Sequence, residues 1–409
     1  MAIKIDGVFT YHITQDRERK NLAILEFIRK KGPVSRAEIS RHLGINIVTI
    51  SNYIDFYINK KIILEVGLDV SSGGRRPELI ELNAKGGCVV GVCLGPEKIS
   101  AIVADLKVKA IAKVSIERPA GKMEDLTPSV IGVIEEVIKK SALGSDKIKN
   151  IGIGISGIVD YPSGTIRDTD PARGRTRVSF LKFSKAIEEH FNMPVYIGND
   201  ASCAAFGEKT LNPAADVDNL VYFYSDVGSG IVTEGDVYIG SSGCAGEIQL
   251  AFNGFSDDER NNFKDCAYMK PFGVDLGVSE AARAAVANGA NTEILKIAGG
   301  DPSRITKATV LEAVSKNDKL ATEIITSAGT AFGIKISYLV NFLNPEIIII
   351  GGGMERSGDA FMDAVRSSIK RFAFEEPAGA AKVIPSLLGE DSIVLGAAAL
   401  SARELFIQA

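Results

Sequence analysis

The sequence predicts an α/β protein with a small helical head and a larger body of two lobes. Its 409 residues are enough for roughly two to four domains of ordinary size. From residue 84 onward, strand-like apolar runs alternate with long helical stretches, which is typical of an α/β architecture. A β-hairpin followed by a helix recurs twice in this region, and the repeat favours a duplicated, two-lobed body.

The composition is that of an ordinary globular protein. Hydrophobic residues make up 45% and charged residues 24%, which excludes a disordered, collagen-like or coiled-coil chain. The longest apolar runs, such as Val89–Leu94 and Ile347–Ile350, are far shorter than the ~20 residues of a membrane span. Residues 1–19 are mixed polar and lack the apolar core of a signal peptide. We therefore expect no membrane association and a cytoplasmic location.

The cysteines point to the same compartment. Five are present, scattered and without CxxC spacing, so we expect neither disulfides nor a cysteine-built metal site. A reducing cytoplasm suits such a set. The positions are Cys88, Cys93, Cys203, Cys244 and Cys266.

Charge is distributed unevenly between head and body. Residues 1–85 carry 14 Lys and Arg against 10 Asp and Glu, whereas the remainder carries 33 against 41. A basic head on an acidic body indicates that a polyanion, if one binds, binds at the head. The alternative is a basic patch without function.

The first helix of the head (residues 1–83) is predicted over Arg17–Lys31. Its apolar residues recur at helical spacing, basic residues in its last turn complement the helix dipole, and Gly32-Pro33 ends it. A Ser-x-x-Glu capping box at Ser35 and Glu38 then opens a short second helix.

Gly44 ends this second helix, because glycine readily takes the left-handed conformation of such a turn. The third helix is predicted over Asn46–Ile58. Its inward positions are expected to be Ile47, Ile50, Ile54 and Ile58. Two short helices joined by a glycine turn are typical of a helix-turn-helix unit.

The outward face of the third helix is suited to DNA. It carries Val48, Thr49, Asn52 and Tyr53. Such small and polar groups can reach base edges in a major groove, where methyl groups suit thymine. We add the helix-start residues Ser35, Arg36 and Asn46 to the predicted contact set. The alternative is a helical hairpin that docks on a partner protein or on the body.

A hairpin is predicted after these helices. Strands are expected at 62–68 and 78–82, on either side of the sequence SSGGRRP. This pattern predicts a β-wing with Arg75 and Arg76 at its tip. Paired arginines suit phosphates or a narrow minor groove. The alternative is a solvated interdomain linker, and a hinge between head and body would also lie here.

The body is divided into a first lobe (84–198, joined by a returning C-terminal helix in 390–409) and a second lobe (199–389). Strands are expected at 89–94, 99–105, 110–117, 151–155, 220–223, 230–233 and 346–350. Helices are expected at 126–142, 279–287, 321–342 and 395–406.

Glycine-rich turns in the body are candidates for binding phosphate. Gly152–Gly157 matches GxGxxG, but turn-forming residues follow it in place of a helix, so we predict no nicotinamide site there. Two other clusters follow apolar strands, where backbone N–H groups can approach phosphate or adenine. The alternative is that these glycines only make tight turns. They are Gly228, Gly230, Gly351, Gly352 and Gly353.

Polar residues that could carry chemistry are Asn199 and Asp200, directly after the strand Val195–Ile197, and Glu247 in an Ala-Gly-Glu sequence. A carboxylate at a strand end beside phosphate loops can accept a hydroxyl proton during phosphoryl transfer. The simpler alternative is that Asp200 caps the helix after it, and spacing alone favours this alternative.

Together these residues resemble the ROK family of repressors, open reading frames and sugar kinases, across essentially the whole chain. The head, the wing and the body follow its transcriptional-repressor branch, such as N-acetylglucosamine and xylose repressors. Residues 197–208 (IGNDASCAAFGE) are similar to its sugar-site segment, 230–247 to its signature, and 347–353 to its adenosine-side glycine motif. The resemblance implies an actin-like (ribonuclease-H-like) two-lobed fold and homodimers or tetramers.

The resemblance also implies roles for single residues. Asp200 would be the catalytic base on the sugar hydroxyl if the chain is a kinase, and Asn199, Asp200 and Glu247 would bind the sugar. The implied partners are a double-stranded DNA operator and a sugar or sugar-derivative effector.

The phosphate loops depart from the family pattern. The first, usually Asp-x-Gly-Gly-Thr, is Cys93–Glu97: Gly95 remains, the magnesium-side acid is gone, Pro96 has no N–H, and Glu97 adds negative charge. The second, usually Gly-Thr-Gly-hydrophobic-Gly, is 224–228 and contains a further acid. We therefore expect a degenerate nucleotide site that has lost ATP.

The family's zinc ligands are missing as well. Leu250 stands where the family has a histidine, and the following segment contains only Cys266. A structural zinc site needs four N or S ligands, so we predict no metal and no cofactor.

The favoured hypothesis is a sugar-responsive DNA-binding regulator that represses carbohydrate-utilisation genes. The second hypothesis is an ATP-dependent kinase of N-acetylglucosamine or glucose, which would need ATP and magnesium. A third is a sugar-binding body whose head binds protein.

Overall fold

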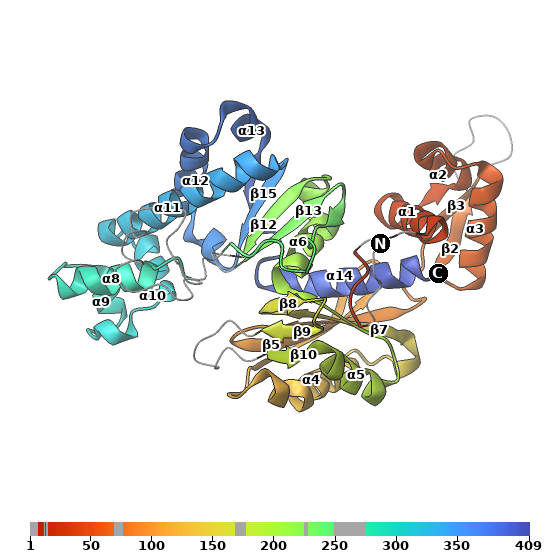
Figure 1. Cartoon of the computed structure of the whole chain (residues 1–409), viewed down its shortest axis with the longest axis horizontal. Coiled ribbons are helices and arrows are strands. Elements are labelled where there is room, and N and C mark those ends of the chain that lie inside the picture. Colours follow the sequence, from red (N-terminus) through yellow and green to blue (C-terminus); the bar gives the residue numbers. More distant parts are fainter. Residues whose placement is uncertain are drawn as a thin grey trace. The chain divides into compact units, whose positions relative to one another are not determined.

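The computed structural model describes residues 7–11, 13, 15–68, 77–167, 177–224, 228–248 and 275–409. The chain divides into two compact units (Figure 1). The first contains Met1–Gly207 and Ile393–Ala409, and the second contains Glu208–Ser392. The described helices include none that is both long and apolar enough to cross a bilayer.

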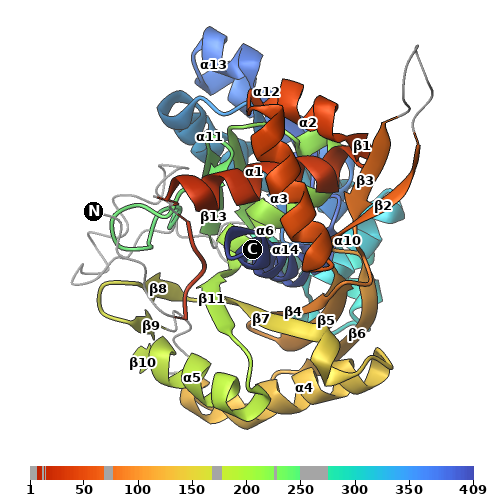
Figure 2. The ribbon, with the colours of Figure 1, turned by 90° about the vertical axis from the view of Figure 1, so that its right-hand side faces the viewer.

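The head lies in the first unit and consists of three helices and a small sheet (Figure 2). The sheet is antiparallel, in the order β1-β3-β2. The predicted helices and the two predicted strands are confirmed, and β1 is an additional element. The elements are α1 (Asp16–Lys31), β1 (Val34–Ser35), α2 (Arg36–Leu43), α3 (Ile47–Asn59), β2 (Ile63–Leu68) and β3 (Glu78–Leu82).

Local hydrogen bonds explain where α2 and α3 begin and end. The capping box is confirmed: the Ser35 hydroxyl accepts from the Glu38 N–H (3.3 Å), and the Ser35 N–H donates to the Glu38 carboxylate (2.7 Å). Gly44 ends α2 with a φ of 66°. Asn46 Oδ1 accepts from the Val48 N–H at 2.8 Å and so caps α3.

The predicted inward face of α3 is partly wrong. Ile50 and Ile54 are fully buried, but Ile47 is 43% exposed because it occupies the first helical position. Tyr57, in place of Ile58, fills the core, and its hydroxyl donates to Asn21 Oδ1 of α1 at 2.8 Å. A buried tyrosine needs such a partner.

The alternative of an interdomain linker at 71–77 is wrong. Strands β2 and β3 pair with each other, so the segment between them joins two strands of one sheet. The connection from the head to the first lobe is instead the short stretch between Leu82 and Cys88. The predicted wing-tip residues Arg75 and Arg76 lie outside the described residues.

The first lobe contains a five-stranded sheet in the order β11-β7-β4-β5-β6. Strands β4, β5 and β6 form an antiparallel meander, whereas β7 runs parallel to β4 and β11 parallel to β7. Helices α4 and α5 lie below the sheet in Figure 1, and α14 lies above it. The elements are β4 (Cys88–Leu94), β5 (Lys98–Asp105), β6 (Ala110–Glu117), α4 (Thr127–Lys140), β7 (Ile148–Ile155), α5 (Phe180–Phe191), β11 (Val195–Asn199) and α14 (Ser392–Ile407).

The same connectivity recurs in the second unit, where the sheet order is β14-β13-β12-β15-β16. Strands β12 to β14 again form a meander, whereas β15 runs parallel to β12 and β16 runs parallel to β15. The predicted duplication is confirmed. The strands are β12 (Leu220–Tyr224), β13 (Gly228–Thr233), β14 (Asp236–Val237), β15 (Ile347–Gly351) and β16 (Lys382–Pro385).

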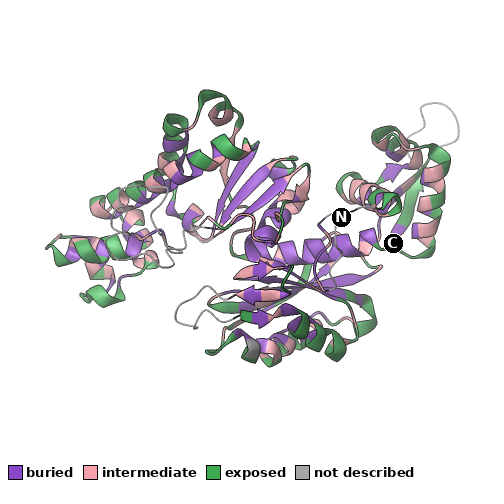
Figure 3. Ribbon diagram, in the orientation of Figure 1, coloured by how far each residue is buried: buried purple, intermediate pink, exposed green. Residues whose placement is uncertain are grey.

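Helices pack beside this second sheet, and α11 and α12 lie side by side (Figure 1). Buried residues follow the strands and the inner helix faces (Figure 3). Strand β15 is buried along its whole length, as expected for a parallel strand covered on both faces. The helices are α8 (Val278–Ala287), α9 (Glu293–Ile297), α10 (Lys307–Ser315), α11 (Lys319–Leu343), α12 (Asp359–Phe372) and α13 (Glu375–Ala380).

An arm that precedes the head, residues 7–11, adds to the sheet of the first lobe. Val8 forms a parallel bridge with Ile197 of β11, and the Ile197 N–H donates to the Gly7 carbonyl at 2.9 Å. Phe9 and Tyr11 are buried there. This arm was not predicted from the sequence.

The C-terminal helix α14 joins the first lobe to the head. A side chain at Gly91 or Gly152 would overlap carbonyl oxygens of α14, so these glycines let the helix lie directly on the sheet. At its other end Phe406 is fully buried in the hydrophobic core of the head. Asn21 Nδ2 of α1 donates to the Ala409 carbonyl at 2.8 Å. Head and first lobe therefore share a core.

Candidate functional site

The best-defined polar site of the first unit lies where β11 ends and α6 (Asp200–Leu211) begins. Asn199 Oδ1 accepts from the Ser202 N–H at 3.2 Å, so Asn199 caps the helix. Its Nδ2 donates to the Gly157 carbonyl at 3.1 Å. The capping role that the sequence offered to Asp200 thus falls to its neighbour.

Asp200 is buried and fully hydrogen-bonded. Its Oδ2 accepts from the Ser156 hydroxyl at 2.5 Å, and its Oδ1 accepts from the Ala201 N–H at 2.8 Å. Burial raises the pKa of this carboxyl group, and the hydrogen bonds from Ser156 and Ala201 oppose that effect. A carboxyl group with a raised pKa at a helix start is suited to exchange a proton or hydrogen bond with a sugar hydroxyl.

Sequence reasoning missed Ser156 and Gly157 as members of this site. They follow β7, which pairs in parallel with β11. Because the carboxyl ends of parallel strands meet at one edge of a sheet, the residues after both strands come together. The GxGxxG sequence at Gly152–Gly157 was the available signal, and it marks this strand end.

The third predicted sugar residue, Glu247, belongs to the second unit and is exposed. The preceding Gly246 carbonyl accepts from the Ser229 N–H (2.8 Å) and hydroxyl (3.0 Å), which fastens this segment to β13. The predicted sugar residues are thus divided between the two units.

The first predicted phosphate loop is a tight turn between β4 and β5. The Gly95 N–H donates to the Lys98 carbonyl at 3.0 Å, and Arg118 donates to the Gly95 carbonyl at 2.9 Å. Since Pro96 has no N–H, neither residue offers a free backbone donor to a phosphate. Glu97 is exposed at the turn.

The glycines of the second unit occupy two settings. Gly228 and Gly230 lie within β13, opposite Tyr224 and Tyr222, so they belong to a hairpin strand. Ser225, Asp226 and Val227 lie outside the described residues.

The other cluster follows β15. Gly352 and Gly353 adopt φ values of 73° and 87°, which favour glycine. The Lys307 ammonium group donates to the Gly352 carbonyl at 3.3 Å. Just beyond, burial raises the pKa of Glu355. When Glu355 is ionised, its negative charge next to the predicted adenosine motif would repel an anionic ligand.

The predicted DNA-contacting residues are arranged around α3. Val48 is 64% exposed, Asn52 is exposed, and Thr49 and Tyr53 are half-buried. Asn46 is exposed, although its Oδ1 is used in the helix cap.

Two members of the predicted contact set have partners inside the head. Ser35 is buried in its capping box. The Arg36 guanidinium contacts carboxylates of Asp55 (3.1 Å), Glu65 (3.1 Å) and Glu78 (3.2 Å), which joins α2, α3 and both hairpin strands. These partners give Ser35 and Arg36 structural roles within the head, and their contact with DNA stays a prediction.

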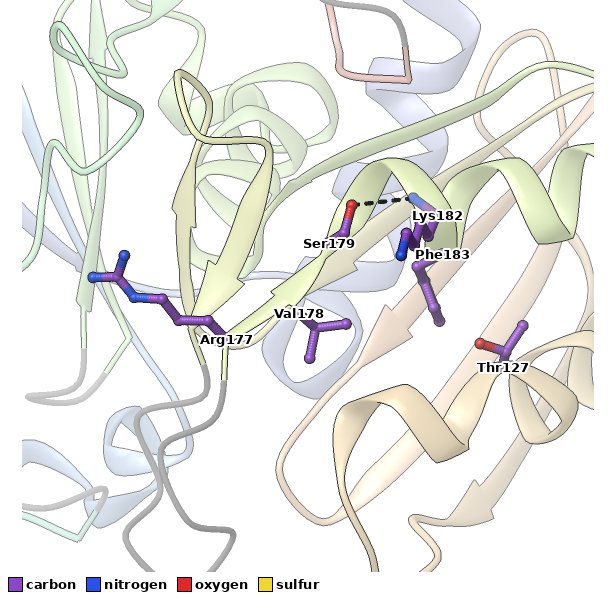
Figure 4. Close-up of a pocket in the computed structure, with 6 residues that line it drawn as sticks. All are labelled: Thr127, Arg177, Val178, Ser179, Lys182 and Phe183. Carbon is purple, nitrogen blue, oxygen red and sulfur yellow. Dashed lines mark hydrogen bonds between the residues drawn. The ribbon is translucent and has the colours of Figure 1, made fainter.

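A separate hollow of about 480 Å³ lies in the first unit (Figure 4). It holds none of the predicted sugar, nucleotide or DNA residues. The Ser179 hydroxyl at its rim accepts from the Lys182 N–H at 3.4 Å and caps α5. The lining residues are Thr127, Arg177, Val178, Ser179, Lys182 and Phe183.

Within the described ranges, no cluster of three or more His, Cys, Asp or Glu side chains is placed to hold a metal ion. Leu250 and Cys266, on which the zinc prediction rests, lie outside those ranges.

Known proteins are similar to this chain over most of its length. The family model "ROK family" matches residues 89–404. The xylose repressor of Caldicellulosiruptor bescii is 27% identical over 94% of this chain and 95% of its own length. The DNA-binding transcriptional dual regulator NagC of Escherichia coli K12 is 24% identical over 95% of this chain and 93% of its own length.

Solved structures show the same fold. A ROK family transcriptional regulator, a homologue of the E. coli MLC protein, superposes with a TM-score of 0.76 at 20% identity, covering 96% of this chain and 99% of its own. A ROK family glucokinase from Streptomyces griseus, solved with glucose and AMPPNP, gives a TM-score of 0.61 at 23% identity and covers 77% of this chain and 99% of its own. The body therefore has the actin-like fold of these proteins, and the chain belongs to the ROK family.

Proposed function

We propose that this chain is a sugar-responsive transcriptional repressor that binds double-stranded DNA through its head. The observation that carries the proposal is the helical pair α2–α3, joined at Gly44, with the small side chains of Val48 and Asn52 exposed on α3. Two relatives that span nearly the whole chain, head included, are named as a repressor and a DNA-binding regulator.

In this proposal the head is a winged helix-turn-helix. Helix α3 enters the major groove with Val48 and Asn52 foremost, and Asn46, Thr49 and Tyr53 lie beside them. The hairpin β2–β3 is the wing, and Arg75 and Arg76, in the sequence between its two strands, would contact phosphates or the minor groove.

The body is proposed to sense a sugar or sugar derivative. Asn199, Asp200 and Glu247 would hydrogen-bond its hydroxyl groups, because carboxylates and amides are suited to such donors. The internal bonding of Gly95, the missing N–H of Pro96 and the partly buried Glu355 support a body that no longer uses ATP. We infer no metal or cofactor, a cytoplasmic location, and a homodimer or tetramer.

DNA binding is tested by fluorescence anisotropy with the DNA upstream of the chain's own gene. We expect affinity to fall steeply as salt rises, because phosphate contacts release counterions. Asn52→Ala should weaken specific binding by about 5- to 150-fold, the range for one base contact. Asn59→Ala, exposed at the far end of α3, is the matched control and should bind as the wild type. Absence of binding at low salt would contradict the proposal.

A sugar kinase is the second candidate, and the buried Asp200 with its raised pKa favours it. It is tested by coupled ADP release over glucose, N-acetylglucosamine and xylose. We expect no turnover. Turnover that disappears in Asp200→Asn would establish the kinase and refute a degenerate nucleotide site.

A further inference from the structure

The arm at residues 7–11 covers the outer edge of β11, the strand that leads into the Asn199–Asp200 turn (Figure 2). Besides the bridge at Val8, the Phe9 N–H donates to the Ile197 carbonyl at 3.4 Å. The Phe9 ring stacks on Tyr196, with ring centroids 5.9 Å apart and planes 20° apart. Backbone and side chains of the arm therefore both hold this strand.

The aromatic rings of the arm reach the residue directly before the polar site. A side chain at Gly198 would place its Cβ 2.6 Å from the Tyr11 hydroxyl and 2.9 Å from the Phe9 ring. Since Gly198 has no side chain, both rings lie directly on the backbone that continues into Asn199. A shift of this backbone would displace the rings, because buried groups are closely packed.

Tyr11 also lies near the first turn of α6. It is 4% exposed, and its ring centroid is 6.1 Å from that of Tyr161. Burial raises the pKa of Tyr11 well above its usual value, and nearby Tyr161 and Cys203 add to this shift. Cys203 follows Asp200 by less than one helical turn. The arm is thus next to both the strand and the helix that meet at Asp200.

The opposite side of the arm holds two buried charges of α14. The Thr10 N–H and hydroxyl donate to the Glu404 carboxylate at 2.5 and 3.0 Å, and the Thr10 carbonyl accepts from the Arg403 guanidinium. Glu404 and Arg403 are 1% and 3% exposed. Buried charges are costly unless they are hydrogen-bonded, so the docked arm and the end of α14 stabilise each other.

The link from the arm to the head is short. Residues 12–15 separate Tyr11 from the first residue of α1. The Arg19 Nε of α1 donates to the Ile13 carbonyl at 2.9 Å, which ties the link to the helix. A chain spans at most about 3.5 Å per residue, so a link of this length has little slack. Movement of the arm would be passed on to α1.

We propose that the arm is a regulatory connector that couples the Asn199–Asp200 turn to the head. A ligand that hydrogen-bonds Asn199 or Asp200 competes with their bonds to Gly157 and Ser156 and so shifts the end of β11. The arm moves with β11, and the short link carries this movement to α1. The identity of the signal, a sugar that alters DNA binding, rests on the proposed function. The connection is additional to the one made by α14.

The first test is hydrogen exchange of the full chain without sugar or DNA, so its outcome does not depend on the proposed function. Ser156→Ala removes a hydroxyl donor from Asp200. It should speed exchange of the Phe9 and Thr10 amides by at least about 5-fold. Ser100→Ala, which removes a hydroxyl from β5, is the control and should leave the arm unchanged. Wild-type exchange of the arm in Ser156→Ala would overturn the proposal.

The reverse perturbation should be felt at the site. Tyr11→Ala should speed exchange of the Ala201 and Ser202 amides, which donate to the side chains of the Asn199–Asp200 turn. Tyr238→Ala removes a half-exposed aromatic ring of the second unit and should not affect these amides. Unchanged exchange at Ala201 and Ser202 in Tyr11→Ala would show that the arm does not support the site.

A lengthened link tests the connection while every described contact of the arm is kept. We insert a flexible Gly-Ser segment of about four residues between Tyr11 and His12. Affinities for DNA and for sugar, from the panel of glucose, N-acetylglucosamine and xylose, should each stay within about 2-fold of the wild type. The sugar-dependent change in DNA affinity should fall by at least about 3-fold.

The matched control inserts the same segment after Gly121, an exposed position between β6 and α4, and should keep the full sugar effect. A full sugar effect in the variant with the lengthened link would refute the connector. A wild type that shows no sugar effect on DNA binding would refute the proposed function instead, and hydrogen exchange would still decide whether the arm and the site are coupled.

Discussion

At the level of single residues, Asp200 and Glu208, the two buried carboxyl groups of α6, have different surroundings. Asp200, at the start of the helix, accepts hydrogen bonds from the Ser156 hydroxyl and the Ala201 N–H, and burial raises its pKa. Glu208, two turns later, is fully buried and accepts hydrogen bonds from Asn212 Nδ2 (2.9 Å), the Ser386 hydroxyl (2.5 Å) and the Leu388 N–H (3.0 Å). Glu208 therefore has a structural role, whereas ligand binding by Asp200 stays a prediction.

The raised pKa of Asp200 predicts a pH-dependent effect of Asp200→Asn. Because the folded-state pKa lies above the unfolded value, the stabilising contribution is complete in acid below the unfolded pKa and is lost as the pH rises through the folded pKa. Asparagine removes the buried charge. The variant should unfold at a higher temperature than the wild type at pH 7, with the difference shrinking toward pH 4.

Differential scanning calorimetry across this pH range checks the prediction. A difference that stays constant with pH, or that grows toward acid, would contradict the raised pKa. The same variant should lose thermal stabilisation by any sugar that stabilises the wild type.

Glu208→Ala is predicted to destabilise the second unit by about 3 kcal/mol, because it leaves buried donors without an acceptor. Glu208→Gln keeps one acceptor oxygen and should cost less. Urea unfolding measures both. Glu312→Ala, which removes an exposed partner of Lys316 on α10, should change stability by about 0.5 kcal/mol or less. Equal effects of Glu208→Ala and Glu312→Ala would show that the Glu208 hydrogen bonds contribute little.

Among the secondary-structure elements, the C-terminal helix α14 connects several parts of the first unit. It rests on β4 and β7, crosses α6 where a side chain at Gly396 would overlap the Cys203 carbonyl, and ends in the core of the head. One helix therefore contacts the strand layer, the helix that starts at Asp200, and the head.

Phe406→Ala is predicted to destabilise the head by about 3 kcal/mol, since it leaves a cavity in the head core. Hydrogen exchange of α1 and α3 amides measures this effect where it is expected. Leu64→Ala, an exposed residue of β2 in the same head, is the control and should change protection little. Unchanged protection in Phe406→Ala would mean that the head does not depend on α14.

At the scale of the whole molecule, the first unit offers a continuous route from Asp200 to the head. Asp200 opens α6, α6 meets α14 at Cys203 and Gly396, and α14 is held in the head by Asn21. Under the proposed function, a sugar bound at Asp200 could thereby alter the head's affinity for DNA. Such coupling is reciprocal: DNA must change sugar affinity by the same factor.

Asn21→Ala is predicted to reduce this coupling. The variant should bind DNA and sugar separately within about 2-fold of the wild type, while the sugar-dependent change in DNA affinity falls toward 1-fold. Anisotropy titrations with and without sugar measure both quantities. Lys20→Ala, which removes only the surface pair with Asp16 on α1, should keep the full sugar effect. Unchanged coupling in Asn21→Ala would exclude the contact of α1 with the end of α14 as the route.

The amino-acid sequence alone was sufficient to predict nearly every strand and helix named from it, the capping box at Ser35, the glycine turn at Gly44 and the duplicated body. These features are local: periodicity shows that a face is buried, and caps and glycines show where a helix begins or ends. The family resemblance rested on short motifs of the same local kind.

What each buried face contacts became clear from the three-dimensional packing. It placed the arm at Gly7–Tyr11 beside β11, Phe406 in the head, Ser156 on Asp200, and three carboxylates around Arg36. In each case the partners are far apart in the chain. The sequence shows that a buried hydrophobic or charged residue needs a partner. Which residue becomes that partner depends on how the strands and helices pack.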